Sequence, residues 1–222
     1  NDSVLKTLDH AIPVCADESC HDTADLDRLV GLYEFVNIKL DKTGRLLFCG
    51  EMRLKKGSSL LFNALEELSG DWSLAVVGGF RGRAEADYRR WSLRNRETAS
   101  RIVMLPYERN VERLRNLYNQ AALVINPALW DGMPNSVLEA MACGRPVLST
   151  NVGGVKDLVK NQETGHLLEL NQLEQMAEKI QQLLNSPDLE SVRPGARQFV
   201  QKNHSPQLEA REFRRVLEQV VG

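Results

Sequence analysis

Two acidic residues, Asp131 and Glu139, lie on either side of a predicted helix start, with seven residues between them. Pro134 suits the first helical position, and Asn135 and Ser136 are residue types that begin helices. Backbone N–H groups at such a start lack partners within the helix, and the helix dipole favours an anion there. Glu139, one turn into the helix, is placed to accept hydrogen bonds from ribose hydroxyls, while Asp131 faces the other end of the ligand. The spacing therefore indicates a site for a sugar nucleotide.

These residues need a strand before their helix, and the chain repeats a strand-then-helix order five or six times. Short apolar runs predict strands over 45–49 and 121–125. A helix is predicted over 58–68, and 189–221 is predicted to be helical with breaks at Pro194 and Pro206. This order predicts an α/β fold with a Rossmann-like, doubly wound parallel sheet in three layers, α/β/α. Ligands of such sheets bind at the carboxyl ends of the strands.

Composition excludes several classes of function. A chain of 222 residues with a net charge of −2 and 42% hydrophobic residues is typical of an enzyme domain, not of a nucleic-acid or membrane specialist. Six arginines between Arg81 and Arg96 are interleaved with acids, which favours a solvated or partner-facing helix over RNA binding. The absence of a run of about twenty apolar residues predicts no transmembrane segment. The first residues lack a signal-peptide pattern, so a cytoplasmic location is predicted.

Motifs for other cofactors are also missing. Neither the GxGxxG fingerprint nor the GxxxxGK[ST] loop occurs, which argues against a dehydrogenase or an ATPase. Cys15 and Cys20, with the histidine beside them, lack a second ligand pair at zinc-finger spacing, so free thiols and no metal are predicted. Cys49 and Cys143 end apolar segments and are predicted to be small core residues. His166 lies near a predicted strand and is predicted to be structural.

The segment 127–154 resembles the donor-binding signature of the group 1 retaining glycosyltransferases, which have the GT-B fold and two acids separated by seven residues. The resemblance implies that Asp131 contacts the transferred sugar and Glu139 the ribose. It implies that the diphosphate lies against the loop and helix start between them, at Gly132, Met133, Asn135 and Ser136. The family more often has glutamate at the first position, and aspartate shortens the side chain by about 1.5 Å, one carbon–carbon bond.

A second segment carries the same resemblance. The family has a glycine at the end of its first strand, then an arginine, then a lysine–glycine pair entering the helix, with both cations directed at the diphosphate. Here Gly50 and Lys56 match, but Glu51 stands in the arginine's place. Arg53 is the candidate substitute, with Lys55 behind it. Glu51 is expected to point away or to pair with a neighbouring cation.

Further matches extend the resemblance over roughly residues 10–205. Residues 73–79 resemble the family's second strand with its glycine turn, 101–105 its third strand, 145–150 a later strand, and 163–165 a turn before residues 167–168. Near Leu105 and Tyr107 the family presents backbone groups to the nucleobase. The resemblance implies retaining transfer of a hexosyl group from a nucleoside diphosphate sugar, the donor substrate, with no cofactor and no metal. The acceptor attacks on the face from which the diphosphate leaves. Asp131, Arg53 and Lys56 are the implied catalytic residues.

The resemblance also implies a domain organisation. Residues 1–10 would be a remnant of the linker or the N-terminal lobe, 11–205 the donor-binding domain, and 206–222 a C-terminal helix. The implied partner is the missing N-terminal lobe, which holds the acceptor: a glycan, a lipid or another polysaccharide precursor. That lobe would also bring the enzyme to the inner face of the membrane. Without it, the chain is expected to be inactive in transfer.

Two alternatives remain open. A sugar-nucleotide epimerase shares the two-lobed architecture, although its signature acids and histidines are not evident. A degenerate, non-catalytic donor lobe is favoured by Glu51 in the arginine's place.

Overall fold

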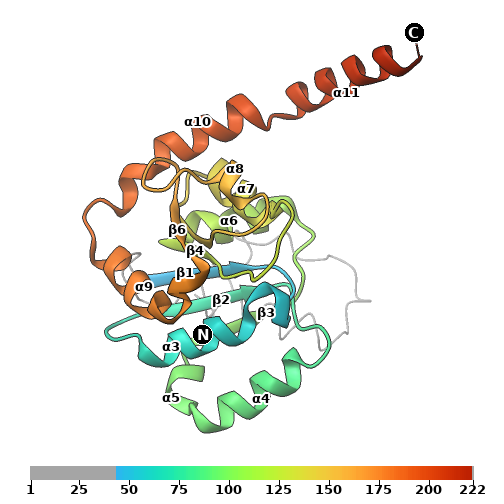
Figure 1. The fold of residues 1–222 in the computed structure, drawn as a ribbon. Helices are drawn as coiled ribbons and strands as arrows, with labels where there is room; N and C mark the ends of the chain where they lie inside the picture. Colours follow the sequence, from blue (N-terminus) through green and yellow to red (C-terminus); the bar gives the residue numbers. More distant parts are fainter. Residues whose placement is uncertain (1–43, 222) are drawn as a thin grey trace, which may run out of the picture.

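The structure, a computed structural model, describes residues 44–221 of the chain. Within them a six-stranded sheet has the order β3-β2-β1-β4-β5-β6, and every neighbouring pair is parallel (Figure 1). The strands are β1 Arg45–Cys49, β2 Ser73–Val77, β3 Ile102–Leu105, β4 Leu123–Asn126, β5 Val147–Thr150 and β6 His166–Leu168. This is the doubly wound order of Rossmann-like folds, with its switch point between β1 and β4. The predicted fold class is confirmed.

Helices cover both faces of this sheet. Because successive side chains of a strand point to opposite faces, Leu46 and Phe48 of β1 pack into one apolar cluster and Leu47 into the other. The first cluster lies under α3 Ser58–Glu67, α4 Ala84–Arg94 and α9 Met176–Asn185. The second lies under α6 Val111–Gln120, α7 Asn135–Ala142, α8 Val155–Leu158 and α10 Arg193–Asn203. The predicted three layers are therefore present.

The remaining elements are short, except at the C-terminus. They are η2 Leu54–Lys56, α5 Arg96–Ala99, η3 Leu170–Gln175, η4 Leu189–Val192 and α11 Pro206–Val221. The last of these extends away from the body of the molecule (Figure 1). Pro206 begins α11 and Pro194 lies at the start of α10, as expected of residues that suit first helical turns. No helix among residues 44–221 is long and apolar enough to cross a membrane.

Several predicted boundaries were wrong by one or two residues. Pro134 precedes helix α7 instead of occupying its first position: its ψ of 111° is extended, and its carbonyl accepts from Val137 and Leu138. Proline fixes φ but leaves ψ free, so the helix begins one residue later. The strand predicted over 121–125 is paired over Leu123–Asn126. Cys15, Cys20 and the predicted segment 1–10 lie outside the described residues.

Candidate functional site

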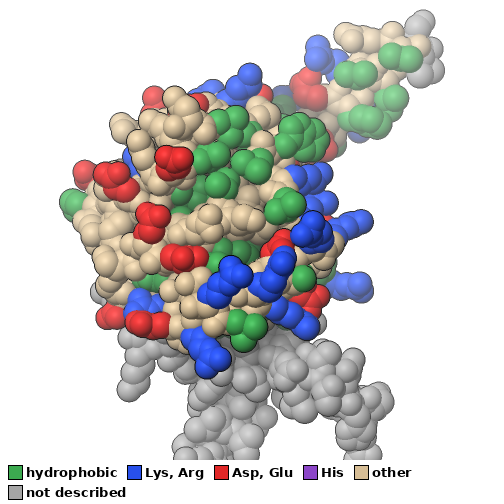
Figure 2. Space-filling view, turned by 60° about the horizontal axis from the view of Figure 1, so that its bottom comes forward, with side chains coloured by type: hydrophobic (Ala, Val, Ile, Leu, Met, Phe, Trp, Pro, Cys, Tyr) green, Lys and Arg blue, Asp and Glu red, His purple; other side chains and the backbone are tan. Residues whose placement is uncertain are grey.

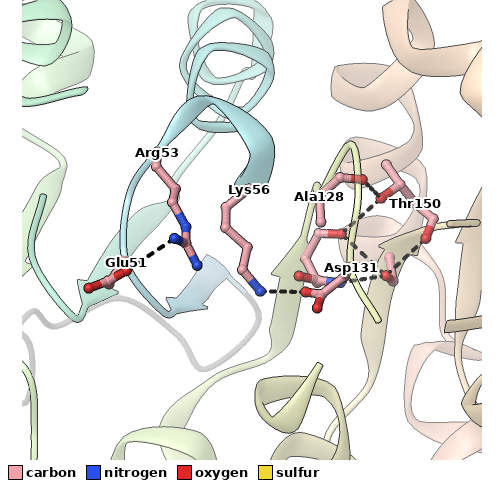
Figure 3. Close-up of polar contacts among 8 residues, drawn as sticks. Glu51, Arg53, Lys56, Ala128, Asp131 and Thr150 are labelled. Carbon is pink, nitrogen blue, oxygen red and sulfur yellow. Dashed lines mark hydrogen bonds and ion pairs between the residues drawn. The ribbon is translucent and has the colours of Figure 1, made fainter. Parts of the chain in front are cut away.

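Two loops meet at the carboxyl ends of β1 and β4, where the switch point opens a place for ligands. Lys56 ends the η2 turn after β1, and Asp131 lies in the loop between β4 and α7. Their side chains form an ion pair (Figure 3). The Lys56 side chain is 20% exposed and the Asp131 side chain 12%. Two residues that the sequence analysis assigned to one site, 75 positions apart, are thus in direct contact.

Glycines on both sides fix the course of the loop that carries Asp131. Gly57 has φ +76°, and a Cβ atom there would lie 1.8 Å from the carbonyl oxygen of Pro127. Gly153 has φ +53°, and its Cβ would lie 1.7 Å from the carbonyl oxygen of Asp131. Side chains larger than hydrogen are excluded at both positions, because backbone atoms already occupy the space. Gly154 N–H also donates to the Gly132 carbonyl at 2.7 Å.

Lys55 fastens the same loop from the η2 side. Its carbonyl oxygen accepts from the backbone N–H groups of Leu129 and Trp130 at 2.9 and 3.3 Å. Its ammonium nitrogen lies 5.0 Å from the centre of the Trp130 ring, within the range of a cation–π contact. Trp130 is 64% exposed. The sequence analysis assigned no role to this tryptophan, although its position next to Asp131 was a signal.

Buried hydroxyl and amide groups join the ends of β4 and β5 beneath the loop. Thr150 donates to the carbonyl of Ala128, and the Asn126 amide donates to Ser149 Oγ at 2.8 Å (Figure 3). All three polar side chains are nearly inaccessible to water. Buried polar groups that are satisfied in this way rigidify their surroundings. The sequence analysis missed this network, because apolar periodicity carries no information about polar residues at strand ends.

Arg53 and Glu51 form a separate pair beside Lys56. The Glu51 carboxylate lies 3.5 Å from Arg53 and 3.3 Å from Arg81. Figure 3 shows Arg53 directed towards Glu51, while Lys56 points towards Asp131. The expectation that Glu51 pairs with a neighbouring cation is confirmed. Arg53 is thereby held away from the Lys56–Asp131 pair.

Glu139 lies in the second turn of α7, and a tyrosine from the neighbouring helix holds it. The Tyr118 hydroxyl donates to Glu139 Oε2 at 2.7 Å, although the two residues are 21 positions apart. Tyr118 is 1% exposed, whereas Glu139 is exposed to solvent. Burial, together with the nearby charge of Glu139, raises the pKa of Tyr118 well above its usual range. The sequence analysis did not identify Tyr118.

The helix start between the two acids is open. No side chain among residues 44–221 caps α7, which is eight residues long. Asn135 is exposed and Ser136 partly so, and Gly132 and Met133 of the preceding loop are exposed. Uncapped helix starts carry unpaired N–H donors and a partial positive charge. The arrangement suits an anion lying between Asp131 and Glu139.

Leu105 and Tyr107 are the residues predicted near the nucleobase. Leu105 is the last residue of β3, and Tyr107 lies in the loop that follows. The Leu105 carbonyl accepts from Gly78 N–H at 3.1 Å, which links the ends of β3 and β2. Leu105 is buried and Tyr107 is 69% exposed. Their predicted contact with a base stays a prediction.

Other reactive side chains lie in packed or solvated surroundings. Burial raises the pKa of Cys49 to about 11, so its thiol is a poor nucleophile at neutral pH, and it packs with Cys143 against the second cluster. His166 is buried on β6, and burial together with Lys179 lowers its pKa to about 4. Residues 44–221 contain no group of three or more acids, cysteines or histidines that could bind a metal.

The arginine-rich helix α4 is balanced by acids. Arg89 pairs with Glu85 at 2.7 Å, and Arg90 pairs with Asp87. Figure 2, which brings the lower part of Figure 1 forward, shows basic side chains beside acidic ones on this side of the molecule. The pairs agree with the predicted solvated helix.

Residues 43–186 match the family model described as glycosyl transferases group 1. The D-inositol 3-phosphate glycosyltransferase of Xylanimonas cellulosilytica is 34% identical over 130 residues, 56% of this chain and 30% of that protein. A stretch of 46 residues, 21% of this chain, is 56% identical to 14% of the L-Ala-D/L-Glu epimerase of Escherichia coli K12. The chain therefore spans a third or less of these relatives' lengths.

Solved structures share the fold at low sequence identity. The C-terminal domain of the group 1 family glycosyl transferase LpcC from Francisella tularensis has a TM-score of 0.66 at 18% identity. That match covers 79% of this chain and 93% of that one. Anabaena HepE in complex with UDP-glucose has a TM-score of 0.74 at 17% identity, covering 89% of this chain and 53% of that one.

Proposed function

Because this chain belongs to the group 1 glycosyl transferases, we propose that it is the donor-binding part of a retaining enzyme that moves a sugar from a nucleoside diphosphate sugar to an acceptor. The observation that carries the proposal is the contact between Lys56 and Asp131 beside the uncapped start of α7. It places a cation, a carboxylate and helix N–H groups at one edge of the sheet. A nucleoside diphosphate sugar fits this arrangement, because its diphosphate can bind the cation and the helix N–H groups while its sugar contacts the carboxylate.

In the proposed complex each group has one task. Glu139 accepts hydrogen bonds from the ribose, and the start of α7 donates to the diphosphate. Asp131 orients the transferred sugar. When the bond to the anomeric carbon breaks, negative charge develops on the leaving diphosphate oxygen, and Lys56 and the helix start stabilise it. Arg53 adds to this stabilisation if it leaves Glu51.

The ion pair between Lys56 and Asp131 bears on how the donor enters. Lys56 is paired with Asp131, and both side chains are partly shielded from water. A diphosphate that binds Lys56 competes with the Asp131 carboxylate for the ammonium group. Asp131 is then released towards the sugar, so the same exchange prepares both contacts.

The whole enzyme needs more than this chain, which spans 30% of the Xylanimonas relative's length and 53% of the HepE chain's. We propose that residues 11–205 form the donor domain and that a further lobe supplies the acceptor, a glycan, lipid or other polysaccharide precursor. The chain alone then binds donor but transfers sugar poorly. We place the enzyme in the cytoplasm, with contact to the membrane's inner face made by that lobe.

Calorimetric titration with UDP, GDP and ADP sugars, with a chelator present, tests the proposal. We expect saturable, metal-independent binding of one nucleotide family, weakened at least tenfold in Lys56→Ala, because hydrogen bonds between charged groups contribute about 1.5–3 kcal/mol. Lys55→Ala is the matched control, since Lys55 is adjacent but contacts Trp130 instead of Asp131. Equal losses in the two variants contradict the assignment of Lys56.

A second candidate is a non-catalytic donor lobe, favoured by the pairing of Arg53 with Glu51. It predicts no nucleotide binding in the titration. A sugar-nucleotide epimerase predicts instead an epimerised donor formed without any acceptor.

A further inference from the structure

The hydrogen bond between Tyr118 and Glu139 joins a buried side chain to an exposed one. Tyr118 is almost completely buried in the second apolar cluster, yet its hydroxyl reaches the tip of a side chain that is open to solvent. The bond joins α6 to α7, and Glu139 is the acid that we assign to the ribose. We propose that Tyr118 is a positioning residue that holds the Glu139 carboxylate for the ribose, so that the site distinguishes ribose from deoxyribose. The inference rests on the proposed function.

The geometry leaves the carboxylate free to bind a ligand. An ionised carboxylate offers about four acceptor positions on its two oxygens, and a phenol hydroxyl uses one. Tyr118 donates to Oε2 at 2.7 Å, a length typical of a charge-assisted bond. The other oxygen and the remaining lone pairs are available to the two vicinal hydroxyls of a ribose.

The surroundings of the phenol direct its single hydrogen to Glu139. The Cys49 thiol also contacts the Tyr118 hydroxyl. Because burial keeps this thiol protonated, it offers no anion that would compete for the phenol hydrogen. The phenol itself stays protonated, since burial opposes its ionisation. Tyr118 therefore remains a donor, and Glu139 is the anion within its reach.

Fixing the carboxylate in advance lowers the cost of binding. A glutamate side chain loses up to about 1.5–2 kcal/mol of rotamer entropy when it is ordered. If Tyr118 orders Glu139 before the nucleotide arrives, ribose binding does not bear that loss. A ligand without one ribose hydroxyl gains less from the same carboxylate. Tyr118 thus affects discrimination at the ribose and leaves the phosphate contacts unchanged.

Tyr118→Phe tests this inference, because phenylalanine keeps the buried ring and removes only the hydroxyl. Affinities of UDP, 2′-deoxy-UDP and 3′-deoxy-UDP are measured by calorimetry in wild type and variant, with the ADP and GDP series used where UDP does not bind. We expect wild type to prefer the ribonucleotide about tenfold or more over one deoxy form, as a hydrogen bond to a charged group predicts. In Tyr118→Phe we expect that preference to fall below about threefold, with deoxynucleotide affinity little changed.

A purely structural role gives a different pattern. If Tyr118 only supports packing, ribo- and deoxynucleotides lose affinity equally and the preference is unchanged, which overturns the inference. Cys49→Ala is the control, since it removes the thiol beside the Tyr118 hydroxyl but keeps both partners of the Tyr118–Glu139 bond, and it should retain the wild-type preference. Failure of wild type to bind any of the three nucleotides overturns the proposed function, and this inference with it.

Folding of the variant is a smaller concern, because Glu139 is exposed and can be solvated once the phenol is gone. Should Tyr118→Phe nevertheless unfold, the wild-type protein offers a second measurement. A tyrosine hydroxyl that is buried and bonded to a carboxylate exchanges slowly with water, so its proton signal is expected in the NMR spectrum. Absence of a protected tyrosine hydroxyl signal overturns the inference.

Discussion

The two ends of the candidate site are built differently. At the ion-pair end, Lys56 and Asp131 hold each other, and we assign both to the ligand. At the phenol end, Glu139 is held by Tyr118, which is too deeply buried to touch a ligand. On this assignment, a diphosphate that arrives at the first end competes with Asp131 for Lys56, whereas Glu139 at the second end is already held for the ribose. The comparison teaches that one site can combine a preformed anchor with a contact that opens on binding.

The two ends are also supported by different kinds of backbone: packed helices at the phenol end and a loop at the ion-pair end. The phenol end rests on α6 and α7, whose apolar faces pack against the sheet. The ion-pair end rests on a loop that lies against Gly57 on one side and Gly153 on the other. Close backbone contact thus gives the loop a fixed course, while its side chains stay free to exchange partners.

Gly153→Ala should break the ion-pair end most severely. The added Cβ would lie 1.7 Å from the Asp131 carbonyl oxygen, at a φ of +53° that disfavours alanine, so the loop must move. The same loop leads into the start of α7, to which we assign the diphosphate, so we expect UDP affinity to fall about tenfold or more, as the loss of a hydrogen bond to a charged group predicts. Calorimetry measures the affinity, and thermal unfolding measures the accompanying loss of stability.

Gly70→Ala is the matched control for that variant. Gly70 has φ +74°, but a Cβ there meets nothing within 4 Å. It therefore bears only the conformational cost of about 1–2 kcal/mol and should leave nucleotide affinity unchanged. If the two alanine variants bind UDP equally well, close contact at Gly153 does not position the loop that leads into α7.

Acid titration of His166, which lies outside the site, measures the stability of the fold apart from the two ends of the site. Burial holds the folded-state pKa of His166 at about 4, below its usual value near 6.5. Stability is then complete above pH 6.5 and falls as pH drops towards 4, because the unfolded chain takes up a proton that the folded chain refuses. We expect a loss of roughly 1–3 kcal/mol over this window in denaturant unfolding. His166→Gln should flatten it, and an unchanged slope would assign the loss to other groups.

Much of the fold could be predicted because its signals are local. Apolar runs marked β1 and β4, and the resemblance to the family marked the other strands. The alternation of strands with helices implied that both acids and Lys56 lie at one edge of the sheet. The Tyr118–Glu139 bond could not be predicted in the same way, since its partners lie on different helices and tyrosine is an ordinary residue of a buried helix face. The contact of Gly57 with Pro127 could not be predicted either, because it depends on how closely two loops approach each other in the folded protein.

Removing a carboxylate charge should have opposite effects at the two ends. In Glu139→Gln a charged acceptor for the ribose is lost, and we expect UDP to bind about tenfold more weakly. In Asp131→Asn the competitor for Lys56 is weakened, and we expect UDP to bind about three- to fivefold more tightly, within the range of partly exposed ion pairs. Calorimetry with UDP, which carries no sugar, measures both. Changes of the same sign would contradict the distinction between a preformed and an opening end.

The smallest expected effect concerns Arg53. Its pair with Glu51 is partly exposed, with 32% and 40% of the side chains accessible, so the pair contributes less than about 1 kcal/mol. Glu51→Gln should release Arg53 towards the diphosphate and tighten UDP binding about two- to threefold in calorimetry. Arg81→Ala removes the other partner of Glu51 and should not, because Arg53 stays paired. If Glu51→Gln and Arg53→Ala both leave affinity unchanged, Arg53 does not substitute for the family's arginine, and Lys56 with the helix start accounts for the whole ion-pair end.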